Sequence, residues 1–110
     1  MENRTIEEME DLLIDEFVKF WGNRVKDFVV SNSTDVPYRM LNIEFTLYNY
    51  ILIRIILEHN SVFFSDVSKG ICLNLLPIAI DVCEVSRCLK EIDSEVRLRI
   101  PDKYLRAKGW

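Results

Sequence analysis

The most apolar stretch of the sequence runs from Met40 to Leu57 and reads MLNIEFTLYNYILIRIIL. Pro37 comes just before it, and proline is well tolerated in the first turn of a helix, where its missing N–H leaves no hydrogen bond unmade. Four polar residues recur at spacings of three, four and three, and would form a narrow stripe on an otherwise apolar helix: Arg39, Asn42, Thr46 and Asn49. We therefore predict a central helix that ends near His59 and is buried on most sides.

A strand over residues 48–57 is the alternative for the second half of this stretch, since isoleucine and tyrosine are good strand formers. Two observations favour the helix: the alternation of apolar and polar residues fails at Ile55-Ile56, and the run is long for a strand. The chain also has only three glycines and three prolines, fewer turn residues than an all-β protein usually needs.

A second helix is predicted from Thr5 towards Val30. Thr5 and Glu8 match a capping box, in which each side chain accepts a hydrogen bond from the backbone N–H of the other residue. Apolar residues follow at helical spacing: Ile6, Met9, Leu13, Phe17, Phe20 or Trp21, Val25 and Phe28. Gly22-Asn23 is the point where this helix is expected to end or bend, and residues 31–35 are expected to form a polar loop.

A third helix is predicted from a heptad pattern, because apolar residues step by four and three through Ile71, Leu75, Ile78, Val82, Val85, Leu89 and Ile92. Pro77 lies inside this pattern and should kink the helix or restart it. Residues 61–70 are either a helix ending at Gly70 or a hairpin with its turn at residues 68–70.

Residues 96–100 alternate in polarity and suggest a short extended segment, after which Pro101 opens a last helical turn through Tyr104 and Leu105. A chain of 110 residues supports one core. We therefore predict a single all-α domain spanning residues 1–110, built as a compact bundle of four to five helices.

The cysteines indicate a reducing compartment. Cys72, Cys83 and Cys88 fall in the third predicted helix, where they would lie too far apart or point apart for a disulfide. We therefore expect reduced thiols in a cytoplasmic protein. The N-terminus is acidic and lacks the pattern of a secretory signal, and Arg54 interrupts the apolar run that could otherwise cross a membrane.

Groups that carry out catalysis are scarce in this sequence. His59 is the only histidine and has no cysteine or aspartate at metal-ligand spacing. The cysteines have no neighbouring base to activate them, and three scattered glycines cannot form a phosphate-binding loop. We therefore expect no catalytic residue, metal or cofactor, and a protein that is not an enzyme.

The charge is distributed unevenly. Residues 1–16 carry seven acids and one base, a net charge of −6, whereas the remaining residues carry 11 acids and 13 bases, a net charge of +2. A solvated surface face explains part of this, since acids suit the first turn of a helix. It does not explain Asp11, Asp15 and Glu16, which lie beyond that turn and repel one another. An acidic surface for a basic partner would explain them.

A small, acidic, mainly helical chain with an acidic helix over Glu7–Glu16 and no catalytic set resembles bacterial immunity proteins. These proteins neutralise toxin domains, often nucleases, of contact-dependent growth inhibition or colicin-like systems. The resemblance implies tight binding that blocks the active site of a basic toxin or covers the surface beside it. It implies five steering charges and two aromatic anchors: Glu7, Glu8, Asp11, Asp15, Glu16, Tyr38 and Tyr104.

Two other classes remain open. A helical regulator or adaptor could form a homodimer through the seam of residues 71–92, although ordinary intramolecular packing explains that seam more simply. A nucleic-acid binder could use the basic segment of residues 97–108 with Tyr104 and Trp110. The formal net charge of −4 argues against nucleic acid as the partner.

Overall fold

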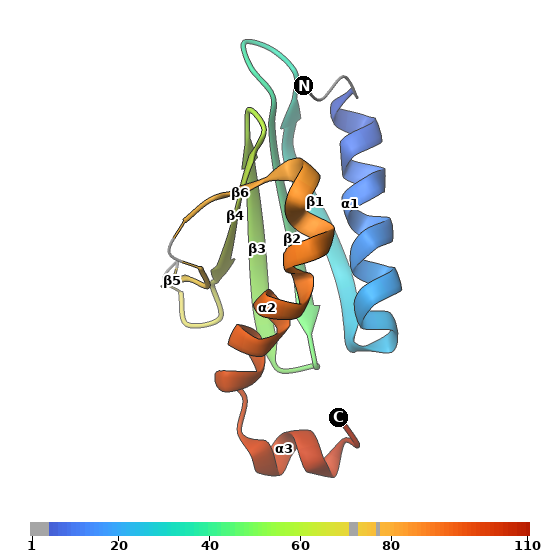
Figure 1. Ribbon diagram of the computed structural model, residues 1–110, viewed down its shortest axis with the longest axis vertical. Helices are drawn as coiled ribbons and strands as arrows, with labels where there is room; N and C mark the ends of the chain where they lie inside the picture. Colours follow the sequence, from blue (N-terminus) through green and yellow to red (C-terminus); the bar gives the residue numbers. More distant parts are fainter. Residues whose placement is uncertain (1–4, 71–72, 77) are drawn as a thin grey trace.

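The chain forms a six-stranded antiparallel sheet with its two longest helices on one face (Figure 1). This computed structural model describes residues 5–70, 73–76 and 78–110. In chain order the elements are α1 (Ile6–Trp21), η1 (Gly22–Arg24), β1 (Val25–Thr34), β2 (Met40–Leu47), β3 (Ile51–Glu58), β4 (Ser61–Asp66), β5 (Leu73–Asn74), β6 (Ile80–Asp81), η2 (Val82–Glu84), α2 (Val85–Leu98) and α3 (Asp102–Ala107). The prediction of an all-α bundle is therefore wrong, and the fold is α/β.

The stretch that was predicted as a central helix is instead the central hairpin of the sheet. The sheet order is β1-β2-β3-β4-β5, and β6 also pairs with β4. The β2–β3 pairing runs unbroken from Met40 opposite Glu58 to Leu47 opposite Ile51. The alternative prediction of a strand in residues 48–57 is confirmed for β3.

Burial alternates along these two strands, as expected for a sheet that is covered on one side. One face is at most 3% exposed and consists of Leu41, Ile43, Phe45, Leu47, Ile51, Ile53, Ile55 and Leu57. The residues between them are half-buried on the other face. Leu52 and Ile56 are apolar members of that second face, which is why the period of two is hard to see in the sequence.

The turn between β2 and β3 explains why so few glycines suffice. Tyr48 and Asn49 have φ angles of 58° and 52°, in the left-handed region that hairpin turns require and that glycine usually occupies. His59, in the turn between β3 and β4, has a φ of 57°. Because non-glycine residues adopt these conformations, the low glycine count does not exclude hairpins.

The capping box at the start of α1 is confirmed. Thr5 Oγ1 accepts a hydrogen bond of 3.2 Å from the Glu8 N–H, and the Thr5 N–H donates one of 3.2 Å to Glu8 Oε1. The helix ends at Trp21, where Gly22 takes a positive φ of 58°. The expected end or bend at Gly22-Asn23 is therefore confirmed as an end, and the continuation towards Val30 is wrong. The predicted polar loop at residues 31–35 is also wrong for residues 31–34, because residues 25–34 form β1 at the edge of the sheet.

The core lies between the sheet and the two long helices. The Phe17 ring of α1 lies 5.1 Å from Phe45 on β2 and 6.1 Å from Phe64 on β4, measured between ring centroids. From α2, four residues enter the same core: Val85, Leu89, Ile92 and Val96. Each helix therefore buries one stripe of apolar residues against the sheet.

The heptad pattern misled the prediction for the third helix. Ile71, Cys72 and Pro77, with its expected kink, lie outside the described residues. The described remainder of the seam contains β5, β6 and η2, and only its end belongs to a helix. Val85, Leu89 and Ile92 are buried inside the chain's own core, so they are not available to a second copy.

The remaining segments divide between correct and wrong predictions. Residues 61–66 form β4, which pairs antiparallel with β5, so the hairpin alternative is confirmed there. The extended segment predicted at residues 96–100 is wrong, because α2 continues to Leu98. The last helical turn after Pro101 is confirmed as α3.

Candidate functional site

Four of the predicted steering charges are exposed on α1: Glu7, Glu8, Asp11 and Asp15. Glu8 also accepts the capping hydrogen bond from Thr5. Within the described parts of the chain, no lysine or arginine nitrogen lies within 4.0 Å of any of these carboxylates. The exposed side of α1 is therefore an acidic surface whose carboxylates make no ion pair with the described residues.

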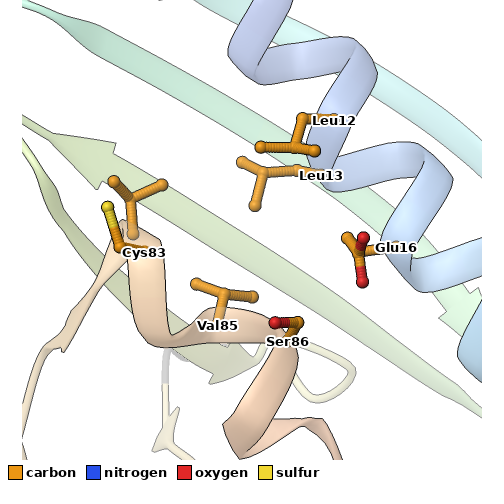
Figure 2. Close-up of a pocket in the computed structure, with 7 residues that line it drawn as sticks. Leu12, Leu13, Glu16, Cys83, Val85 and Ser86 are labelled. Atoms are coloured by element: carbon orange, nitrogen blue, oxygen red, sulfur yellow. The ribbon is translucent and has the colours of Figure 1, made fainter. Parts of the chain in front are cut away.

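A groove of about 270 Å³ lies between α1 and the start of α2 (Figure 2). Its apolar walls are Leu12, Leu13, Val82 and Val85, and its polar side chains are Glu16, Cys83 and Ser86. Glu16, the fifth predicted steering charge, is half-buried in this groove, unlike the four exposed acids. Sequence reasoning missed the groove because its walls come from segments about 70 residues apart.

Tyr38 lies at the same end of the molecule as the start of α1. It belongs to the loop between β1 and β2, where Asp35 Oδ2 accepts a hydrogen bond of 3.4 Å from the Ile6 N–H. Tyr38 is 38% exposed, and its ring stacks on the His59 ring with 4.6 Å between centroids and 21° between planes. This stacking holds an accessible aromatic side chain near the acidic surface.

Tyr104 does not join the acidic surface. Its hydroxyl donates a hydrogen bond of 2.7 Å to the Tyr48 carbonyl oxygen, which attaches α3 to the β2–β3 turn. The Trp110 ring lies 5.4 Å from the Tyr48 ring, again between centroids. The two aromatic residues suggested for nucleic-acid binding therefore make contacts inside the chain.

Two buried aromatic residues, Tyr48 and Trp21, form a polar cluster with the half-buried Asp93 that the sequence did not suggest. The Tyr48 hydroxyl and the Trp21 indole N–H both donate to Asp93 Oδ1, over 2.5 Å and 2.9 Å. Tyr48 and Trp21 are 0% and 1% exposed. The hydrogen bonds of this cluster join α1, the β2–β3 turn and α2.

Two arginines flank the same tyrosine. The guanidinium carbons of Arg97 and Arg24 lie 5.6 Å and 5.8 Å from the centroid of the Tyr48 ring, within range of a cation–π interaction. Burial raises the pKa of the Tyr48 hydroxyl above its usual value of 10.0, and the hydrogen bond to Asp93 raises it further. Arg97 opposes this by donating a hydrogen bond to the Tyr48 oxygen.

The described residues contain no group of three histidine, cysteine or acidic side chains placed to hold a metal ion. His59 faces Tyr38 rather than a cluster of ligands. Cys83 is exposed and Cys88 is half-buried, whereas Cys72 lies outside the described residues. No helix in the described part of the chain is long and apolar enough to cross a membrane.

Comparisons of this chain with protein-family models, curated proteins and solved structures give no match.

Proposed function

We propose that this protein binds and neutralises a basic toxin domain, in the manner of a bacterial immunity protein. It acts in the cytoplasm by occluding the active or substrate-binding surface of the toxin, and not by catalysis. The observation that supports the proposal is the exposed row of carboxylates on α1, which has no basic partner among the described residues.

The arrangement of these charges has a cost that a partner would remove. Asp11 and Asp15 are four residues apart on one helix, so their carboxylates repel each other and destabilise α1 slightly. A basic partner converts this repulsion into attraction and steers the encounter. A nuclease domain presents such a basic surface, because it has to bind the phosphate backbone of its substrate.

Tyr38 supplies the anchor in this proposal. Aromatic residues dominate the energetics of many interfaces when their rings are held in place before binding. The stack on His59 holds the Tyr38 ring, and the contact between Asp35 and Ile6 keeps its loop at the start of α1. The acidic surface and the anchor can thus contact one partner together.

The first experiment tests neutralisation. The protein is used to capture its partner from the source cells, and each captured domain is then expressed alone and together with this chain. We expect one basic domain that stops growth when expressed alone and is harmless in co-expression. If no captured domain is toxic, or if co-expression does not rescue growth, the proposal is wrong.

Matched charge reversals then test the acidic surface. The double variant Asp11→Lys, Asp15→Lys avoids Glu8, whose reversal would also break the capping box. The control, Glu91→Lys with Asp102→Lys, changes the net charge equally at two exposed residues outside α1 and away from Tyr38 and His59. We expect the association rate with the toxin to fall at least about tenfold for the first pair at low salt and much less for the control. If both pairs lower the association rate equally, net charge alone explains the decrease and the acidic surface of α1 has no specific role.

A further inference from the structure

We propose that the groove between α1 and α2 is a recognition pocket for a single arginine side chain of the protein partner. The inference rests on the proposed function, since it names the residue that a basic partner would insert beside the acidic surface. It depends on three properties of the groove: its apolar walls, its half-buried carboxylate and its polar group on the opposite wall.

The walls suit the stem of a long side chain. Leu12 and Leu13 project from α1, and Val85 projects from α2 on the other side (Figure 2). An arginine buries its methylene groups against such apolar surface while its charged end stays at the polar rim. The volume of about 270 Å³ accommodates one long side chain.

Glu16 gives the groove its charge preference. It is half-buried, and no lysine or arginine nitrogen lies within 4.0 Å of it among the residues that the structure describes. None of the described residues that line the groove is basic. A partly desolvated carboxylate interacts more strongly with a cation than a fully hydrated one does, so this acid should be the strongest contact on α1.

Ser86 favours arginine over lysine. Glu16 lies on the α1 side of the groove and Ser86 on the α2 side (Figure 2). A guanidinium is planar and presents N–H donors along more than one edge, so it can donate to a carboxylate and to a hydroxyl at once. A lysine ammonium is a compact point charge and makes poorer use of acceptors on two walls.

The test uses N-acetyl-arginine N-methylamide, which carries the guanidinium without a competing carboxylate. Titrated into the full-length protein and followed by nuclear magnetic resonance, it should bind with a dissociation constant of roughly millimolar order. Chemical-shift changes should be centred on the amides of Leu12, Cys83 and Ser86. Glu16→Gln should weaken binding about fivefold or more, whereas Glu10→Gln should leave it unchanged. Glu10 is the matched control, because it is also half-buried on α1 but does not line the groove.

A second readout uses the exposed thiol in the groove. Saturating capped arginine should slow the alkylation of Cys83 and leave that of Cys88, which does not line this groove, unchanged. The capped lysine and citrulline analogues should bind more weakly, since the first lacks the planar donors and the second lacks the charge. Free arginine should also bind more weakly, because its carboxylate meets the acidic surface.

Two results would overturn the inference: citrulline binding as well as arginine, or Glu10→Gln weakening arginine as much as Glu16→Gln does. The outcome is distinguishable from that of the proposed function. If the toxin is neutralised but Glu16→Gln does not reduce affinity for it, the groove is not the pocket and the proposed function still stands. If capped arginine binds at Glu16 and no toxin is neutralised, the proposed function fails while the groove keeps its specificity.

Discussion

Tyr48 and Asp93 are joined by a hydrogen bond of 2.5 Å from the tyrosine hydroxyl to Oδ1 of the aspartate. This contact connects the turn between β2 and β3 to α2 across 45 residues of sequence. Trp21 at the end of α1 donates to the same oxygen. Asp93 therefore accepts hydrogen bonds from two of the three elements that meet here, the β2–β3 turn and the end of α1, while it belongs to the third, α2.

Removing the Tyr48 hydroxyl should destabilise the protein. In Tyr48→Phe the ring stays but Asp93 loses one of its two donors, and a hydrogen bond to a charged group contributes about 2 kcal/mol. Urea denaturation should show a loss of that order in the free energy of unfolding. Tyr50→Phe is the control, because Tyr50 is 48% exposed, and it should change stability by less than about 0.5 kcal/mol. Equal losses in the two variants would rule out a special role for the Asp93 contact.

The raised pKa of Tyr48 predicts a loss of stability at high pH. Below its usual pKa of 10.0 the tyrosine is protonated in both the folded and the unfolded chain, so its contribution is complete. As the pH rises further, the unfolded chain releases this proton before the folded chain does, and the free energy of unfolding falls. The decrease between about pH 9 and pH 11 should be steeper in the wild type than in Tyr48→Phe. Parallel curves for the two proteins would contradict the raised pKa.

Phe17 should be among the most sensitive core residues. It is 0% exposed and its ring lies 5.7 Å from Trp21 and 5.1 Å from Phe45, between centroids. Phe17→Ala should cost about 3–5 kcal/mol in the free energy of unfolding, because it removes buried surface and leaves a cavity. Val18→Ala, one residue further on at 47% exposure, should cost less than about 0.5 kcal/mol. Calorimetry of both variants measures the difference, and similar melting temperatures would show that α1 does not pack as described.

The capping box should contribute measurably to α1. Thr5→Ala removes the acceptor for the Glu8 N–H and should cost about 1 kcal/mol. Thr5→Ser keeps a hydroxyl at the same position and should restore most of that stability. The measurement is the midpoint of urea denaturation, with the dependence of the free energy of unfolding on urea concentration unchanged. A Thr5→Ser variant as unstable as Thr5→Ala would show that the hydroxyl does not stabilise the helix.

The central hairpin shows where sequence reasoning reached its limit. The β2 and β3 strands alternate in burial, but Leu52 and Ile56 place apolar residues on the uncovered face and obscure the alternation. Tyr48 and Asn49 occupy turn positions that are usually marked by glycine. Strand preference depends on neighbours that are distant in the chain, so a local pattern cannot decide between a buried helix and a buried strand.

The candidate site also combines features that the local sequence predicts with features that depend on distant segments. The acidic residues of α1 could be predicted as an exposed face, because helical period and charge are local properties. The groove that Glu16 lines, and the hydrogen bond from Tyr104 to the β2–β3 turn, depend on segments brought together by folding. The sequence pattern does not reveal that the Tyr104 hydroxyl donates a hydrogen bond to the Tyr48 carbonyl oxygen.

The sequence by itself determined the start of α1, its buried stripe, the short α3 and the excess of acid at the N-terminal end. In each of these the interacting residues lie within a turn or two of each other, so their energies are set by spacing alone. Only the tertiary structure decided that residues 40–57 form a hairpin, that Asp93 joins three elements, and that α1 and α2 enclose a groove. These features arise from contacts between distant segments, whose burial outweighs the smaller differences in local conformational preference.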